Sequence, residues 1–233
     1  MRFKMMAMVA GAAIAVPAAA VQPVTITSAG IYDPGHVTAT VGGTSKDEYA
    51  AALNFTTAES RSGAPDLLGF CVDLPHPIYV NIGSQLAETL HFHVAPLTTD
   101  GYGNPLSSGQ VRQITGLARL GFTIGHGSAA DTATQLAAIQ QAIWTVEYPT
   151  ATFAAAGDNA AAQATYAASF LAQAPRLSGF VRFLSSDDGT IQGQATDVGG
   201  VPEPASWALL VAGFGVVGAL QRRRSGTLAT VAA

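Results

Sequence analysis

The sequence predicts an α+β protein, built as an antiparallel β-sandwich or barrel-like sheet with a three-helix insertion. This domain is expected between an N-terminal signal peptide and a C-terminal membrane-sorting helix. Strand-like alternation before residue 95 and again after residue 178 encloses a stretch with helical periodicity. No regular βαβ alternation is present, which argues against a parallel sheet.

The first part of the chain is expected to form short strands. Apolar and polar residues alternate at residues 24–27, 36–41, 52–56, 67–73, 78–82 and 90–94. Pro34-Gly35 and Gly42-Gly43 are turn signals between the early strands.

Three helices are expected next. The first covers residues 109–120 and follows a Ser107-Ser108 cap. The second covers residues 132–147, where Thr132 and Gln135 have the spacing of a capping box. The third, rich in alanine, begins near Asp158-Asn159 and stops at Pro175.

The domain is expected to close with a hairpin. Strands at residues 179–184 and 190–195 flank a turn at Asp187-Asp188-Gly189. The sequence therefore divides into a domain at residues 21–196 and a linker at residues 197–204.

Composition excludes several classes of protein. The chain has 233 residues, of which 48% are hydrophobic and 11% charged, so it is not wholly disordered. Its single cysteine excludes a disulfide scaffold and a zinc site built on several thiolates. Residues 21–201 carry six Lys+Arg against 14 Asp+Glu, a net charge of −8, so a nucleic-acid partner is not expected.

The N-terminus has the pattern of a secretory signal peptide at residues 1–20. Arg2 and Lys4 precede an apolar stretch, and Pro17 then leads to three alanines that suit cleavage after Ala20. The apolar run is too short for a membrane anchor. We therefore expect export through the Sec translocon.

The C-terminus has three parts in order. Pro202-Glu203-Pro204 leads into an apolar segment at residues 205–220, and Arg222, Arg223 and Arg224 begin a basic tail at residues 221–233. Arginines at one end favour a cytoplasmic position for the tail of a transient membrane span.

This tail resembles the PEP-CTERM sorting signal of exported proteins in Gram-negative bacteria. The resemblance rests on Pro202-Glu203-Pro204, the apolar segment and the arginines, and covers about thirty residues. It implies processing by an exosortase-type protease and delivery to the cell surface, outer envelope or extracellular matrix. An extracellular polysaccharide is a further partner that the resemblance implies.

Two segments of the domain carry candidate chemistry. Cys71 lies on an expected strand, and its thiol is either buried and inert, bridged to another molecule, or reactive. On the second helix, the apolar stripe predicts that Gln141 faces solvent and that Gln140 lies beside Trp144 at the core margin. A half-buried amide needs a hydrogen-bonding partner, which a backbone carbonyl or water could supply.

Together these segments resemble the thioester domains of bacterial surface adhesins. Phe70-Cys71-Val72 matches the strand motif of that family, and Ile139-Gln140-Gln141-Ala142-Ile143 matches its helix motif. The resemblance implies that Cys71 and Gln140 form an internal thioester, which amines on a target surface open. It implies no catalytic turnover, so the chain is expected not to be an enzyme, and no cofactor is expected.

Three alternatives remain at this level. A surface or matrix protein with an inert Cys71 needs no chemistry. A Cys/His hydrolase would pair Cys71 with His76 or His93, although no oxyanion motif accompanies them. His91 and His93 alternate on one strand and begin a metal site, but a third ligand is missing and no metal is expected. Asp73 either orients a neighbouring side chain or is a solvated turn acid, and the second role is expected.

Overall fold

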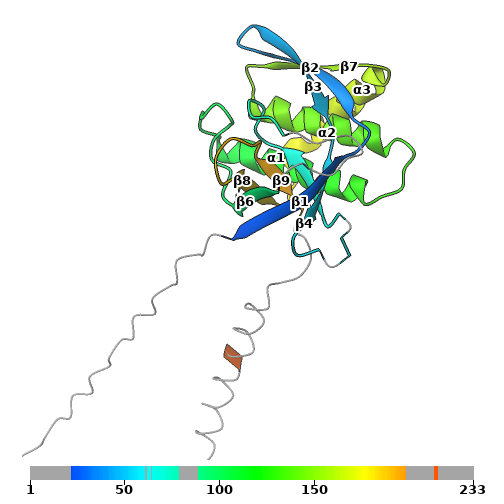
Figure 1. Ribbon diagram of the computed structural model, residues 1–233. Coiled ribbons are helices and arrows are strands. Elements are labelled where there is room, and N and C mark those ends of the chain that lie inside the picture. The colour runs from blue at the N-terminus through cyan, green and yellow to red at the C-terminus, as the bar shows by residue number, and fades with distance from the viewer. Residues whose placement is uncertain (1–21, 61, 64, 79–88, 198–212, 215–233) are drawn as a thin grey trace, which may run out of the picture. The chain divides into compact units, whose positions relative to one another are not determined.

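The computed structural model describes residues 22–60, 62–63, 65–78, 89–197 and 213–214 (Figure 1). The predicted signal peptide, almost all of the expected strand at residues 78–82 and of the sorting segment, and the whole basic tail lie outside these residues. Among the described residues, no helix has the length and apolar character needed to cross a membrane.

The described residues form nine strands and three α-helices. The strands are β1 (Pro23–Ile31), β2 (Gly35–Val41), β3 (Thr44–Ala50), β4 (Leu53–Thr57), β5 (Leu67–Cys71), β6 (Leu90–Val94), β7 (Thr152–Ala156), β8 (Arg182–Ser186) and β9 (Gln194–Thr196). The helices are α1 (Ser108–Gly125), α2 (Thr132–Glu147) and α3 (Ala160–Gln173), and a 3-10 turn η1 (Ala174–Arg176) follows α3.

Six strands close into an antiparallel barrel with the order β1-β4-β5-β9-β8-β6. The other three form a small antiparallel sheet with the order β3-β2-β7. The three helices lie in sequence between β6 and β8, with β7 among them. The predicted α+β class and antiparallel pairing are therefore confirmed, and the larger sheet is a closed barrel.

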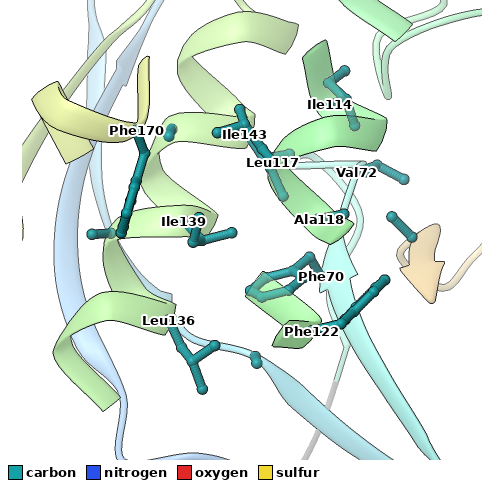
Figure 2. Packing of buried hydrophobic residues seen from close by; sticks show 14 of the residues in the cluster. Phe70, Val72, Ile114, Leu117, Ala118, Phe122, Leu136, Ile139, Ile143 and Phe170 are labelled. Carbon is teal, nitrogen blue, oxygen red and sulfur yellow. The ribbon is translucent and has the colours of Figure 1, made fainter. Parts of the chain in front are cut away.

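The helices join the two sheets through α2. This helix packs against α1, α3 and all three strands of the small sheet, while α1 also contacts β5 and β9 of the barrel. Figure 2 shows Phe70 of β5 pointing among Phe122, Ile139 and other apolar side chains of α1 and α2. Because α2 is covered on several sides, ten of its 16 residues are buried, including polar ones.

A second cluster fills the barrel and the space beside α2. Ile26, Phe55 and Phe92 are fully buried there, and Cys71 and Trp144 belong to the same cluster. Successive side chains of a strand point to opposite faces. Phe70 therefore reaches the helical cluster, whereas Cys71 reaches this one, so β5 is buried on both faces.

Two strands, β3 and β7, escaped the sequence analysis. β3 contains the exposed residues Ser45, Lys46 and Asp47 and the half-buried Glu48, which give no apolar alternation. It forms a strand because Gly42-Gly43, both with positive φ, turn the chain so that β3 pairs with β2. β7 is rich in alanine and pairs with the other edge of β2.

Helix α1 begins as expected, whereas the predicted capping box of α2 is wrong. Ser107 caps α1 and forms a complete capping box with Gln110. Helix α2 has Asp131 at its N-cap, and the Thr132 hydroxyl donates to the Ala129 carbonyl instead of capping. Gln135 reaches back to the Asp131 carboxylate, so the side chains interact one position earlier than predicted.

The terminal hairpin is confirmed with shifted bounds. β8 and β9 pair antiparallel, but β8 runs on to Ser186 and β9 begins only at Gln194. Asp188 accepts hydrogen bonds from Ser186 and Thr190 in the connecting loop, which holds its pKa down at about 2. The strand predicted at residues 67–73 ends at Cys71.

Candidate functional site

The strand β5 places Cys71 at a gap in the barrel's hydrogen bonding. β4 pairs only with residues Leu67 to Gly69 of β5, so the edge of β5 beyond Gly69 lacks a neighbouring strand on that side. On the other side, Cys71 is in register with Gln194 of β9. The N–H and C=O groups of Cys71 therefore need a partner that is not a strand.

The side-chain amide of Gln140 fills this gap. The Cys71 N–H donates to Gln140 Oε1 at 2.8 Å, and Gln140 Nε2 donates to the Cys71 carbonyl at 2.9 Å. Gln140 is fully buried, so its predicted place at the core margin is wrong. The reason is that β5 and the small sheet cover this part of α2. The structure thus brings together the two residues that the sequence singled out.

The thiol of Cys71 is buried and unpaired with any other cysteine. Its side-chain partner is Gln194, whose Nε2 lies 3.6 Å from Sγ. Burial raises the pKa of the Cys71 thiol to about 12, and the Gln194 hydrogen bond offsets this only in part. A thiol with such a pKa is a poor nucleophile toward external reagents at neutral pH.

Gln141 is also buried, which contradicts its predicted solvent exposure. Its Nε2 donates to the Phe153 carbonyl of β7 at 2.9 Å, and its Oε1 accepts from Gln163 Nε2 at 3.1 Å. Periodicity predicted an exposed face because it could not show that α3 and β7 cover it. The Gln141 side chain therefore links α2 to β7 and α3 by hydrogen bonds, at a place away from Cys71.

A cavity of about 530 Å³ adjoins Cys71, and we call it the cysteine cavity. Cys71 and Trp144 contribute to its wall, and Lys46 and Glu48 of β3 face it from the small sheet. Burial raises the pKa of Glu48, although nearby Lys46 counteracts this. Cys71 itself is 7% exposed. The remaining lining comes from Ile31, Tyr49, Ala51, Leu53, Leu74, Pro75, His76, Pro77, Ile78 and Gln192.

Asp73 and His76 form a hydrogen-bonded pair in the loop that follows β5. His76 Nδ1 lies 2.7 Å and 2.8 Å from the two Asp73 carboxylate oxygens. Asp73 therefore orients a neighbouring side chain, and its predicted role as a solvated turn acid is wrong. Since Nδ1 is engaged, the Nε2 atom of His76 is the nitrogen left to act in the cavity.

The loop that carries this pair is fixed by Tyr148. The Tyr148 hydroxyl accepts hydrogen bonds from the backbone N–H groups of Leu74 and Gly101. Gly101 lies so close to Asp73 that an added Cβ would come within 2.2 Å of its Oδ1 atom. Gln192 Nε2 also donates to the Asp73 carbonyl at 2.6 Å.

Glu147 is a buried acid one helical turn beyond Trp144. It is 1% exposed, and neither carboxyl oxygen reaches a partner at hydrogen-bonding geometry among the described residues. Burial raises its pKa well above the usual range, nearby Asp73 and Asp100 add to this, and the Tyr148 hydroxyl lowers it slightly. Burial therefore favours the protonated, uncharged form of the Glu147 carboxyl.

The histidines of β6 lie elsewhere. His93 Nδ1 contacts the Asp187 carboxylate at 2.7 Å, and His91 is exposed on the same strand. Within the described ranges, no group of three or more His, Cys, Asp or Glu is placed to hold a metal ion.

Sequence reasoning missed Gln194, Gln192, Tyr148 and Glu147. Gln192 and Gln194 are both buried, and their alternation within the strand expected at residues 190–195 was the available signal. Glu147 is the only acid within α2, and its position at the helix end gave no signal of burial.

Comparison with known proteins identifies the C-terminal motif. Residues 200–224 match the family model described as the PEP-CTERM protein-sorting motif. This region includes Pro202-Glu203-Pro204 and Arg222 to Arg224. The motif indicates an exported protein that an exosortase processes and that crosses the membrane toward the cell surface or extracellular space. Searches of curated proteins and of solved structures find no significant match.

Proposed function

We propose that the exported domain forms an internal thioester between Cys71 Sγ and Gln140 Cδ, and uses it to attach covalently to amines on a target surface. The observation that carries this proposal is the reciprocal pair of hydrogen bonds between the Gln140 amide and the Cys71 backbone. The pair holds the amide carbon beside the residue that bears the thiol.

Thioester formation needs no external reactant. Cys71 Sγ attacks Gln140 Cδ, the carbon–nitrogen bond breaks, and the amide nitrogen leaves as ammonia with the thiol proton. The Cys71 N–H already donates to Oε1, where negative charge develops in the tetrahedral intermediate. This donor is fixed before the reaction, so the backbone serves as an oxyanion hole.

Opening of the thioester completes the function. A primary amine that enters the cysteine cavity attacks Cδ, the carbon–sulfur bond breaks, and the amine's proton passes to the sulfur. The product is an amide that links Gln140 to the target. The His76 imidazole, oriented by Asp73, lines this cavity and is placed to accept the amine proton.

A second candidate is a surface or matrix protein with an inert Cys71. It is favoured by the complete hydrogen bonding of the Gln140 amide, which also serves to finish the edge of β5. The raised pKa of the thiol points the same way. Both candidates fit an exosortase substrate that reaches the cell surface by way of the Sec translocon.

The deciding experiment is the intact mass of the exported protein with and without methylamine. A thioester makes the chain lighter by one ammonia, and methylamine then adds once, at Gln140. Cys71→Ala and Gln140→Ala each abolish both changes, whereas the exposed Gln173→Ala serves as a matched control that keeps them.

Other results would select the alternatives. A mass equal to the plain sequence, unchanged by methylamine, supports the inert surface protein. Sustained turnover of a chromogenic ester that Cys71→Ala abolishes supports the Cys71/His76 hydrolase, because a thioester reacts once per chain.

A further inference from the structure

A second cavity lies between the end of β6, α1 and the chain that leads into β8. Its volume is about 540 Å³, within the range of roughly 300–1,000 Å³ typical of small-molecule sites. We call it the arginine cavity. Apolar side chains dominate its wall, which consists of Val94, Ala95, Pro96, Leu97, Val111, Arg112, Thr115 and residues 177–183.

Phe180 adds an exposed aromatic ring to this cavity. It belongs to the cavity wall and is 68% exposed, although aromatic rings of this size are usually well buried. An apolar wall together with an exposed ring indicates a site that removes a carbon chain from water.

Positive charge gathers around the same cavity. Arg112 and Arg182 line it directly. The stem of Arg119 packs over Gly179, where an added Cβ would lie 2.8 Å from Arg119 Cγ. Arg176 directly precedes the lining residue Leu177. Two of the six Lys+Arg in residues 21–201 therefore line this cavity, and two more adjoin its lining residues, in a stretch whose net charge is −8.

These arginines have no partner within the described part of the chain. All three ion pairs found there involve histidine, and none of the four guanidinium groups makes a hydrogen bond or ion pair with a described residue. The four arginines are unpaired even though residues 21–201 contain more than twice as many acidic as basic side chains. Charge complementarity therefore calls for an anionic group at this rim.

We infer that the arginine cavity binds a long-chain carboxylate, with the acyl chain against Val111 and Phe180 and the carboxylate at Arg112 and Arg182. Guanidinium groups bind carboxylates through paired, charge-assisted hydrogen bonds. A neutral lipid would leave the arginines unused, and a compact anion would leave the apolar wall exposed. The site is independent of the proposed thioester because Cys71 does not line it.

The test is site-resolved photolabelling of the full chain in phosphatidylcholine nanodiscs. Palmitic acid that carries a diazirine serves as the probe, and peptides are mapped after irradiation. We expect label on peptides that cover residues 94–97, 111–115 and 177–183, and we expect unlabelled palmitic acid to compete better than palmityl alcohol. Label on residues 205–220, the segment expected to enter the membrane, serves as the reference for probe that is merely dissolved in the bilayer.

Matched variants separate the arginine contribution from general charge. Arg112→Gln/Arg182→Gln should lower cavity labelling about tenfold or more, since each lost charged hydrogen bond weakens binding by about that factor. Lys46→Gln removes a positive charge outside this cavity and should leave the labelling unchanged. Equal thermal unfolding temperatures would show that the variants fold.

Three results would overturn the inference. Absence of label on the cavity peptides would mean that the cavity takes no such ligand or that another part of the chain occupies it. Equal competition by palmityl alcohol would show that the anionic head group is not recognised. Unchanged labelling of the double arginine variant would show that Arg112 and Arg182 do not bind the carboxylate.

Discussion

Gln140 and Cys71, which are 69 positions apart in the sequence, pair through two hydrogen bonds as two strands would. The primary amide of Gln140 presents one acceptor and one donor, the same set that a neighbouring peptide would present. Its place is the edge of β5 that β4 leaves uncovered. One side chain of α2 therefore completes the barrel's hydrogen bonding at the only cysteine in the chain.

Loss of this amide should destabilise the domain. In a Cys71→Ala background, in which no thioester forms, Gln140→Ala leaves a buried N–H and a buried C=O without a partner. Each unsatisfied group costs about 1–3 kcal/mol, so we expect the free energy of unfolding to fall by roughly 2–6 kcal/mol in urea titrations. Gln173→Ala, on the exposed face of α3, should change it by less than about 0.5 kcal/mol. A similar small effect at Gln140 would contradict the pairing.

The thiol should resist alkylation in the folded protein. After methylamine treatment, which frees any thioester sulfur, a pKa of about 12 leaves a thiolate fraction on the order of 10⁻⁴ at pH 8. We expect slow reaction with iodoacetamide in buffer and complete reaction in urea, as measured by mass. Equally fast alkylation under both conditions would show that Cys71 is accessible and ionised.

Glu147 should make the protein less stable as pH rises. Its pKa is raised in the folded state, so the unfolded chain releases this proton first, from about pH 4.5 upward, and holds fewer protons than the native state. Stability is then full below that pH and falls as pH rises toward the folded pKa, by at most about 1.4 kcal/mol per pH unit.

Glu147→Gln removes this proton and keeps the shape of the side chain. Urea unfolding should give similar stabilities for variant and wild type at pH 4, and a growing advantage for the variant toward pH 7. Parallel pH profiles would show that Glu147 does not carry the effect.

A glycine in α1 should resist replacement. A Cβ on Gly121 would lie 2.4 Å from Phe70 Cζ and 3.0 Å from Ile139 Cγ2, so Gly121→Ala must displace the ring that joins β5 to the helices. We expect a loss of about 1–3 kcal/mol in unfolding free energy despite alanine's better helix propensity. Gly109→Ala, whose nearest contact would be an ordinary 3.7 Å, should be neutral or stabilising. The opposite order would contradict the packing in Figure 2.

His76 should govern how fast an amine opens the proposed thioester. A positioned general base contributes about 10²–10⁴-fold, so His76→Gln should slow methylamine incorporation within that range, and Asp73→Asn should slow it less. His91→Gln, which changes an exposed histidine on β6, is the matched control. If both histidine variants react at the wild-type rate, His76 takes no part in the proton transfer.

Much of the fold was predictable because local sequence patterns, such as helix caps and apolar stripes, indicate where its elements begin and which face is buried. The Ser107-Ser108 cap predicted the start of α1, and the stripe of Leu136, Ile139 and Ile143 predicted the inner face of α2. The polar strand β3 was missed because its side chains give no apolar alternation, and its stability comes from pairing with β2 across the Gly42-Gly43 turn.

The candidate site was predictable only in part. The motifs singled out Cys71 and Gln140, but periodicity along one helix could not reveal that β5, α3 and β7 bury Gln140 and Gln141. Gln194 contacts Sγ from 123 residues away, a distance over which no local pattern acts. Asp73 was misjudged because its partner His76 became apparent only from the loop geometry.

Barrel closure has a consequence for the order of events during export. β1, β4, β5 and β6 leave two open edges, at β5 and β6, and only the β9–β8 pair joins them. The last of these residues, Thr196, stands four positions before the sorting motif begins. If the chain is exported with its N-terminus first, the barrel cannot close around the sulfur of Cys71 until β9, directly before the motif, has emerged. The strand that completes the barrel and the sorting motif are therefore neighbours in the chain and emerge one directly after the other.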